Sequence, residues 1–151
     1  MDYNEQTATV NDQLIPQILE KTEKSKAGKA RVSILYDGVT PNNYIPNIDF
    51  YKYDDHSDFD RINEKELNIK QLLGVLDFNC FGNNEVITNK LTDLYLFISL
   101  LNHSNTPNCL NLMFEEKNNI RFIIADKDMN EGTELSIKYA DNVSKWGIKD
   151  E

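Results

Sequence analysis

Two short polar motifs near the C-terminal end constrain the fold of this 151-residue chain more than any other feature. The first is Asn-His-Ser-Asn-Thr-Pro-Asn at residues 102–108, and the second is Gly-Thr-Glu-Leu-Ser-Ile-Lys-Tyr at residues 132–139, about two dozen residues later. Between them, apolar residues alternate with other residues along 110–114, and residues 120–125 are largely apolar. Alternation of this kind is typical of strands. The pattern predicts two short strands joined by a turn, followed by a third strand over residues 135–139.

Together the two motifs resemble the paired signatures of SET domains, the protein lysine methyltransferases. Two loosely defined motifs rarely occur by chance in this order and at this separation. Within the superfamily, the chain is most similar to the SET and MYND domain methyltransferases and their fungal relatives. Leu94–Leu101 matches the segment that precedes their first motif, and Asn79-Cys80-Phe81 matches their Asn-x-Phe element at the end of a helix. The resemblance covers roughly residues 63–141.

The resemblance implies an α+β architecture, the SET-domain (β-clip) fold. This fold has short, mostly antiparallel strands, a pseudoknot and inserted helices, with residues 102–107 packed beside the strand that carries Tyr139. No Gly-x-Gly turn precedes residue 60, Asn105 stands where the family usually has a cysteine, and the MYND and post-SET cysteines are not found. We therefore expect a truncated or divergent N-terminus. The expected division is a helix and loop region of unclear assignment at 1–60, a SET-like region at 61–142 and a tail at 143–151.

The resemblance also implies an activity. SET enzymes transfer a methyl group from S-adenosylmethionine to a lysine amine, a displacement that depends on alignment and a dry channel more than on acid or base groups. Asn79, Asn102 and His103 occupy the positions that bind the cofactor in the family, and Tyr139 occupies the catalytic position at the methyl-transfer centre. No metal site is implied, since two cysteines are too few to hold zinc without other ligands.

Each of these residues also has a structural explanation. Asn102 and His103 fit a turn with an asparagine cap and a hydrogen-bonded histidine. Asn79 fits a residue in left-handed conformation at a helix C-terminus. Tyr139 fits an ordinary core position at the end of an alternating strand. The sequence thus also allows a catalytically inactive SET-like interaction module or a partial SET protein.

The charge of the chain bears on its partners. A net charge of −9 and a pI near 4.7 disfavour direct binding to nucleic acid and favour lysine-bearing protein substrates, such as a basic tail. The same acidity can simply serve solubility. No apolar run reaches the length of a membrane span, and the first residues do not resemble a signal peptide. We expect an intracellular protein of the nucleus or cytoplasm, without membrane association.

The first hundred residues carry weaker patterns. Residues 12–27 predict an amphipathic helix that ends at Gly28, and an apolar alternation predicts a strand over 30–36. Residues 40–61 predict a loop. Asn63, with Glu66 at the capping-box position, predicts the start of a helix that ends near Asn79, and the apolar run 94–101 predicts a buried segment.

Overall fold

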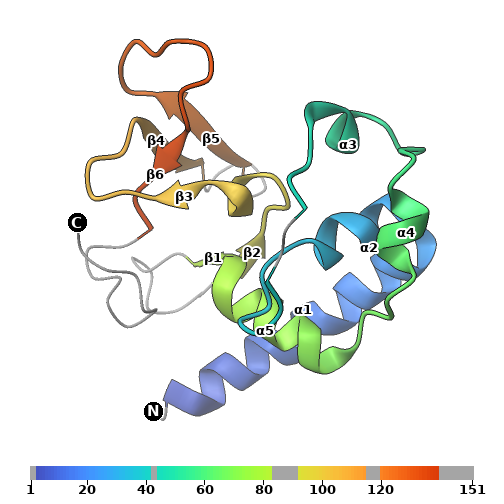
Figure 1. Cartoon of the computed structure of the whole chain (residues 1–151). Helices are drawn as coiled ribbons and strands as arrows, with labels where there is room; N and C mark the ends of the chain where they lie inside the picture. Colours follow the sequence, from blue (N-terminus) through green and yellow to red (C-terminus); the bar gives the residue numbers. More distant parts are fainter. Residues whose placement is uncertain (1–2, 42–43, 83–91, 115–119, 140–151) are drawn as a thin grey trace. The chain divides into compact units, whose positions relative to one another are not determined.

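The computed structural model describes residues 3–41, 44–82, 92–114 and 120–139. Figure 1 shows the elements, which fall into two compact units, residues 1–99 and residues 100–151. The described elements of the first unit are mainly helices, and those of the second are mainly short strands. The chain therefore has the mixed helix and strand composition that the sequence predicts. No helix in the described ranges is long and apolar enough to cross a membrane.

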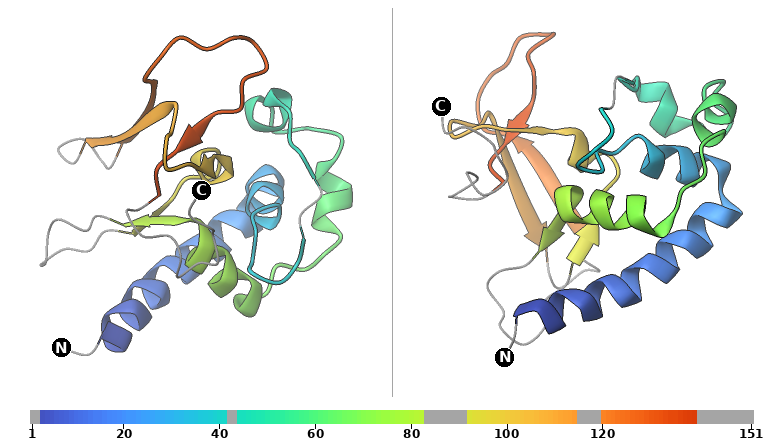
Figure 2. Two further views of the ribbon diagram at one scale, coloured as in Figure 1. Left: turned by 60° about the vertical axis from the view of Figure 1, so that its left-hand side comes forward. Right: turned by 60° about the horizontal axis from the view of Figure 1, so that its bottom comes forward.

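Five α-helices are described in the first unit: α1 Tyr3–Lys24, α2 Lys26–Ser33, α3 Ile48–Lys52, α4 Phe59–Asn63 and α5 Ile69–Asn79. Helix α1 contacts both α2 and α5, and Figure 2 shows it running beside them. Strands β1 (Cys80–Gly82) and β2 (Thr92–Leu94) follow and pair antiparallel.

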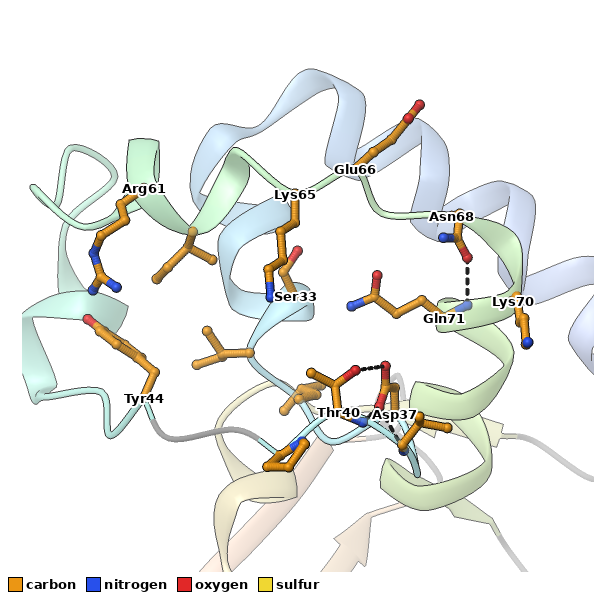
Figure 3. A pocket seen from close by; sticks show the side chains of 15 residues that line it. Ser33, Asp37, Thr40, Tyr44, Arg61, Lys65, Glu66, Asn68, Lys70 and Gln71 are labelled. Carbon is orange, nitrogen blue, oxygen red and sulfur yellow. Dashed lines mark hydrogen bonds between the residues drawn. The ribbon is translucent and has the colours of Figure 1, made fainter.

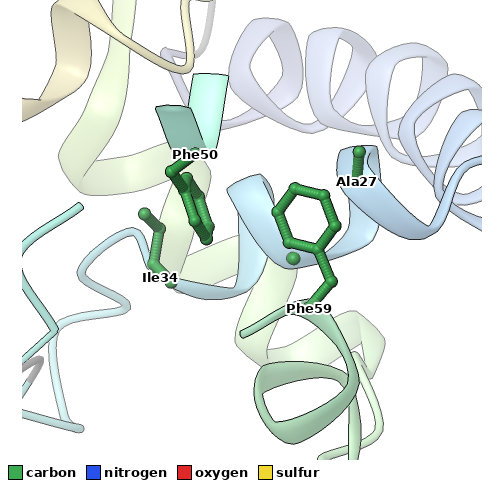
Figure 4. Packing of buried hydrophobic residues seen from close by; sticks show 5 residues of the cluster. Ala27, Ile34, Phe50 and Phe59 are labelled. Carbon is green, nitrogen blue, oxygen red and sulfur yellow. The ribbon is translucent and has the colours of Figure 1, made fainter. Parts of the chain in front are cut away.

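The core of α2, α3 and α4 is an aromatic and aliphatic cluster, shown in Figure 4. Phe50 and Phe59 have no exposed surface, and their rings meet edge to face at 5.1 Å. Arg31 holds the C-terminal end of α3 by donating hydrogen bonds to the carbonyl oxygens of Phe50, Tyr51 and Tyr53. These carbonyls would otherwise lack partners within so short a helix.

Several predictions in this unit are wrong. The first helix extends from Tyr3 to Lys24, and Gly28 lies inside α2, because the Ser25 side chain accepts the Gly28 amide hydrogen and caps a new helix. The expected strand over 30–36 is largely helix α2. Ala27, Ala30 and Val32 are the buried residues of α2. Ala27, Ala30 and Ile34, which follows the helix directly, belong to the hydrophobic cluster, and their spacing of three and four is the helical period.

The region 40–61 is not a simple loop, because it contains α3 and the start of α4. Asn63 ends α4 and does not begin a helix; Asn68 caps α5, with its side chain accepting the Gln71 amide hydrogen at 2.9 Å. The end of that helix at Asn79 is as predicted. The run 94–101 is only half-buried, and Phe97 is 50% exposed.

The second unit holds β3 (Asn102–His103), β4 (Cys109–Phe114), β5 (Ile120–Ala125) and β6 (Ser136–Ile137), and the 3-10 turn Ile98–Leu100 leads into it. Strands β4 and β5 pair antiparallel in register Cys109 to Ala125, which confirms the two predicted strands. The turn expected between them lies outside the described residues. Strand β6 is shorter than predicted, and it pairs with β3 in parallel.

Candidate active site

The pairing of β3 with β6 brings the two sequence motifs together. Asn102 is the register partner of Ser136, His103 is the partner of Ile137, and the Ser104 amide donates to the Ile137 carbonyl at 3.1 Å. The Ile137 residue of β6 is fully buried, and its burial anchors β6 in this strand pairing. The predicted proximity of the first motif to the strand leading to Tyr139 is therefore confirmed.

His103 is fixed by hydrogen bonds at both ring nitrogens. Its Nδ1 accepts the backbone amide hydrogen of Tyr139 at 3.0 Å, so the ring proton belongs on Nε2, which can donate to Asn105 Oδ1 at 3.0 Å. The imidazole and phenol rings lie 5.3 Å apart. The imidazole of His103 thus positions the backbone of Tyr139.

Tyr139 is held at its other end as well, because its hydroxyl donates a hydrogen bond to the Leu101 carbonyl oxygen. Desolvation raises the pKa of the Tyr139 phenol above its ordinary value, so it stays protonated at neutral pH. The residue is still 37% exposed. Two oxygen atoms, a carbonyl and a protonated phenol, therefore lie side by side at an accessible point.

Asn102 uses its side chain within the site. Its amide nitrogen donates to a Glu134 carboxylate oxygen, and both residues are exposed. In the described part of the chain its amide oxygen makes no hydrogen bond. Sequence reasoning assigned no role to Glu134, although this residue is the glutamate of the second motif.

Asn108 is a second residue that sequence reasoning missed. It is 9% exposed; its amide nitrogen donates to the Glu134 carbonyl at 2.8 Å, and its amide oxygen accepts the Ser136 amide hydrogen at 2.8 Å. Its backbone carbonyl accepts the Asp126 amide hydrogen at 2.9 Å. The Pro-Asn end of the first motif was the available signal. Asn108 joins the loop after β3 to β6, and so holds the two motifs in register.

Replacing Asn108 with alanine should therefore destabilise the second unit by about 2 kcal/mol, because the Glu134 carbonyl and the half-buried Ser136 amide lose their partner. Amide hydrogen exchange of Ser136 and Ile137 measures the effect directly. Asn111→Ala is the matched control, since Asn111 accepts a single bond from Arg121 at 3.2 Å. Equal exchange rates in the parent and in Asn108→Ala would contradict this role.

Asn79 lies in the first unit, at the end of α5, and is 8% exposed. Its amide nitrogen donates to the carbonyl oxygens of Tyr36 and Val75, each at 2.7 Å, so both of its hydrogens are used within the chain. Its backbone carbonyl accepts from Ser99 Oγ at 2.9 Å. Within the described ranges, its amide oxygen accepts no hydrogen bond. Of the four predicted site residues, three come together in the second unit and Asn79 belongs to the first.

The cysteines offer no nucleophile. Burial raises the pKa of the Cys80 thiol to about 12, and Cys109 is 3% exposed. Among the described residues, no group of histidine, cysteine, aspartate or glutamate side chains could hold a metal ion. Hydrogen-bonding groups and a phenol gather at the pairing of β3 with β6.

The comparisons with known proteins give the family of this chain. The family model of the SET domain matches residues 6–140, so the chain belongs to the SET-domain family, a family of protein lysine methyltransferases. The match begins far upstream of residue 63, where the motif resemblance starts. No curated protein and no solved structure matches the chain.

Proposed function

We propose that this chain is an S-adenosylmethionine-dependent protein-lysine N-methyltransferase. The observation that carries the proposal is the position of the Tyr139 hydroxyl. This hydroxyl donates a hydrogen bond to the Leu101 carbonyl oxygen, and the backbone amide of Tyr139 donates a hydrogen bond to His103. A protonated phenol cannot act as a general base at neutral pH, but its oxygen can orient an amine and stabilise positive charge. Methyl transfer from a sulfonium to an amine requires both an oriented amine and stabilisation of the positive charge.

The residues present fit the expected cofactor. S-adenosylmethionine supplies a methyl group on a positively charged sulfonium. Oxygen atoms favour such a cation, and Leu101, Tyr139 and Glu134 provide a carbonyl, a phenol and a carboxylate. Asn102 would hold the cofactor through its exposed side-chain amide, and His103 would hold it through its backbone. The family resemblance also assigns a cofactor-binding role to Asn79, which lies in the first unit.

The substrate follows from charge. The chain carries nine more acidic than basic residues, and the segment between β5 and β6 holds the exposed Asp126, Asp128, Glu131 and Glu134 beside a single lysine. Such a surface attracts positively charged protein segments and repels phosphate backbones. We propose a lysine-bearing protein with a basic tail as the substrate, and the nucleus or cytoplasm as the compartment.

The subfamily is part of the same proposal. Leu94–Leu101 and Asn79-Cys80-Phe81 favour a relative of the SET and MYND domain methyltransferases. No Gly-x-Gly turn precedes residue 60, although the family model matches from residue 6, so we propose that this part of the domain has diverged.

One observation favours a second candidate, a catalytically inactive SET-like module that binds a partner. Tyr139 is 37% exposed, whereas methyl transfer needs a channel that excludes water. The test is methyl incorporation from S-adenosylmethionine into a set of lysine-rich peptides. Incorporation that depends on the parent chain supports the enzyme, and cofactor binding without incorporation supports the module.

Replacing Asn102 with alanine should weaken S-adenosylmethionine binding by about 1–3 kcal/mol, because it removes an amide from the pocket and leaves partner groups without hydrogen bonds. Isothermal titration calorimetry of the purified chain measures this. Asn111→Ala should bind like the parent, since Asn111 lies on β4 and contacts Arg121. Equal affinity of Asn102→Ala and the parent would remove Asn102 from the site.

A further inference from the structure

The first unit contains a pocket that the methyltransferase proposal does not use. It has a volume of about 730 Å³ and lies between the end of α2, the loop that follows it, α4 and the start of α5, as Figure 3 shows. Volumes of this size are typical of small-molecule sites. Its inner side borders the cluster around Phe50 and Phe59, because Ile34 belongs to both. The pocket is therefore built on the most tightly packed part of the unit.

Three cationic and two acidic side chains line the pocket, an excess of one positive charge in a protein that is acidic overall. Arg61, Lys65 and Lys70 line it, and neither lysine forms an ion pair in the part of the chain that the structure describes. Arg61 is held in place by Asp58 at 3.4 Å, and its guanidinium lies 5.8 Å from the centre of the Tyr44 ring. Figure 3 shows the Lys65 side chain reaching into the pocket from the connection before α5.

The acidic residues of the lining do not offset these charges fully. Asp37 is committed to its own loop, where its carboxylate accepts the amide hydrogens of Val39 and Thr40 at 2.9 and 2.7 Å and the Thr40 hydroxyl at 3.1 Å. The Glu66 side chain points away from the pocket in Figure 3. Helix α5 starts in the pocket wall without an acidic residue in its first turn, so the positive end of its dipole adds to the field.

The rest of the lining is apolar or neutral. Ile34, Leu35, Ile62 and Pro41 supply hydrophobic surface, and the Gln71 side chain extends toward the middle of the pocket. A ligand that fits both parts has an anionic group and an apolar body. We propose that this pocket binds a small organic anion, in which a phosphate or carboxylate is joined to an apolar or aromatic group.

Titration of the isotope-labelled full chain, followed by amide chemical shifts, tests the proposal. Phenyl phosphate and benzoate carry the two anionic groups, and their relative affinities distinguish phosphate from carboxylate as the preferred group. Benzyl alcohol has the ring without the charge, and inorganic phosphate has the charge without the ring. We expect one of the two organic anions to shift residues 33–41 and 61–71 with a saturable profile and to bind more tightly than benzyl alcohol or phosphate.

Variants of the cationic side chains locate the site. Lys65→Gln should weaken binding of the better anion by roughly tenfold, because it removes a charge-assisted hydrogen bond. Lys52→Gln makes the same change of charge on α3, where the lysine lies over the Tyr53 ring outside the pocket, and should bind like the parent. A melting temperature within error of the parent checks that each variant folds. Equal weakening in both variants, equal binding of benzyl alcohol, or shifts spread over unrelated surface lysines would overturn the proposal.

Discussion

Replacing Tyr139 with phenylalanine is expected to lower methyl-transfer turnover by at least about tenfold, roughly 1.4 kcal/mol of transition-state stabilisation. The substitution removes only the hydroxyl that donates to the Leu101 carbonyl. The His103 contact should survive, because it uses the backbone amide of residue 139. Cofactor affinity should therefore stay nearly unchanged while kcat falls. Methyl incorporation into lysine-rich peptides, with calorimetry of cofactor binding in parallel, measures both quantities.

The control separates catalysis from stability. Tyr53→Phe removes a hydroxyl from a tyrosine that is 46% exposed in the first unit, and it should change neither turnover nor melting temperature. A purely structural Tyr139 would show the opposite pattern from the one predicted. Its phenylalanine variant would melt earlier and keep full turnover per folded molecule.

Replacing Phe50 with alanine is expected to cost about 3–5 kcal/mol of unfolding free energy in the first unit. Its ring has no exposed surface and contacts four other rings, those of Tyr44, Tyr51, His56 and Phe59, at centroid distances of 5.1 to 5.4 Å. Truncation removes these ring contacts and leaves a cavity in the cluster. Arg31 also contacts this cluster, through a hydrogen bond to the Phe50 carbonyl oxygen. A loss of this size is a large share of the stability of a domain of this length.

Denaturant unfolding followed by far-ultraviolet circular dichroism measures this loss, because the α-helices that the structure describes all lie in the first unit. Phe97→Ala is the matched control. That ring is 50% exposed and meets Tyr51 alone among the aromatic contacts of the described residues, so its loss should cost far less. Similar unfolding midpoints for the two variants would contradict the central place of Phe50.

Strands β4 and β5 were more predictable than helices α3 and α4, and the difference has a physical cause. Strands β4 and β5 form a local hairpin, in which alternation and a polar turn are both visible in the sequence. Helices α3 and α4 have five residues each, and nothing local favours them strongly. They depend on Arg31 and on the Phe50 and Phe59 cluster, which are tertiary features. Residues 30–36 show the same effect, since their apolar alternation fits a strand until the packing of Ala27, Ala30 and Ile34 is known.

The proximity of the two motifs was predictable from the sequence, but the hydrogen bonds between them were not. The motifs indicated that Asn102 and His103 would lie near Tyr139, and the parallel pairing of β3 with β6 brings them together. That pairing joins residues more than thirty positions apart, and its register determines which groups of the two motifs can form hydrogen bonds. The histidine contact to the Tyr139 backbone, the bond between Asn102 and Glu134, and the bridging role of Asn108 all depend on it.

The central claim is that this small parallel pairing is a cofactor site. Titration of S-adenosylmethionine into the isotope-labelled full chain, followed by amide chemical shifts, tests it most directly. We predict saturable shifts in residues 101–105 and 137–139 that require higher cofactor concentrations in Asn102→Ala and stay nearly unchanged in Tyr139→Phe. Saturable binding that leaves these two segments unshifted, or the absence of any binding, would contradict the claim.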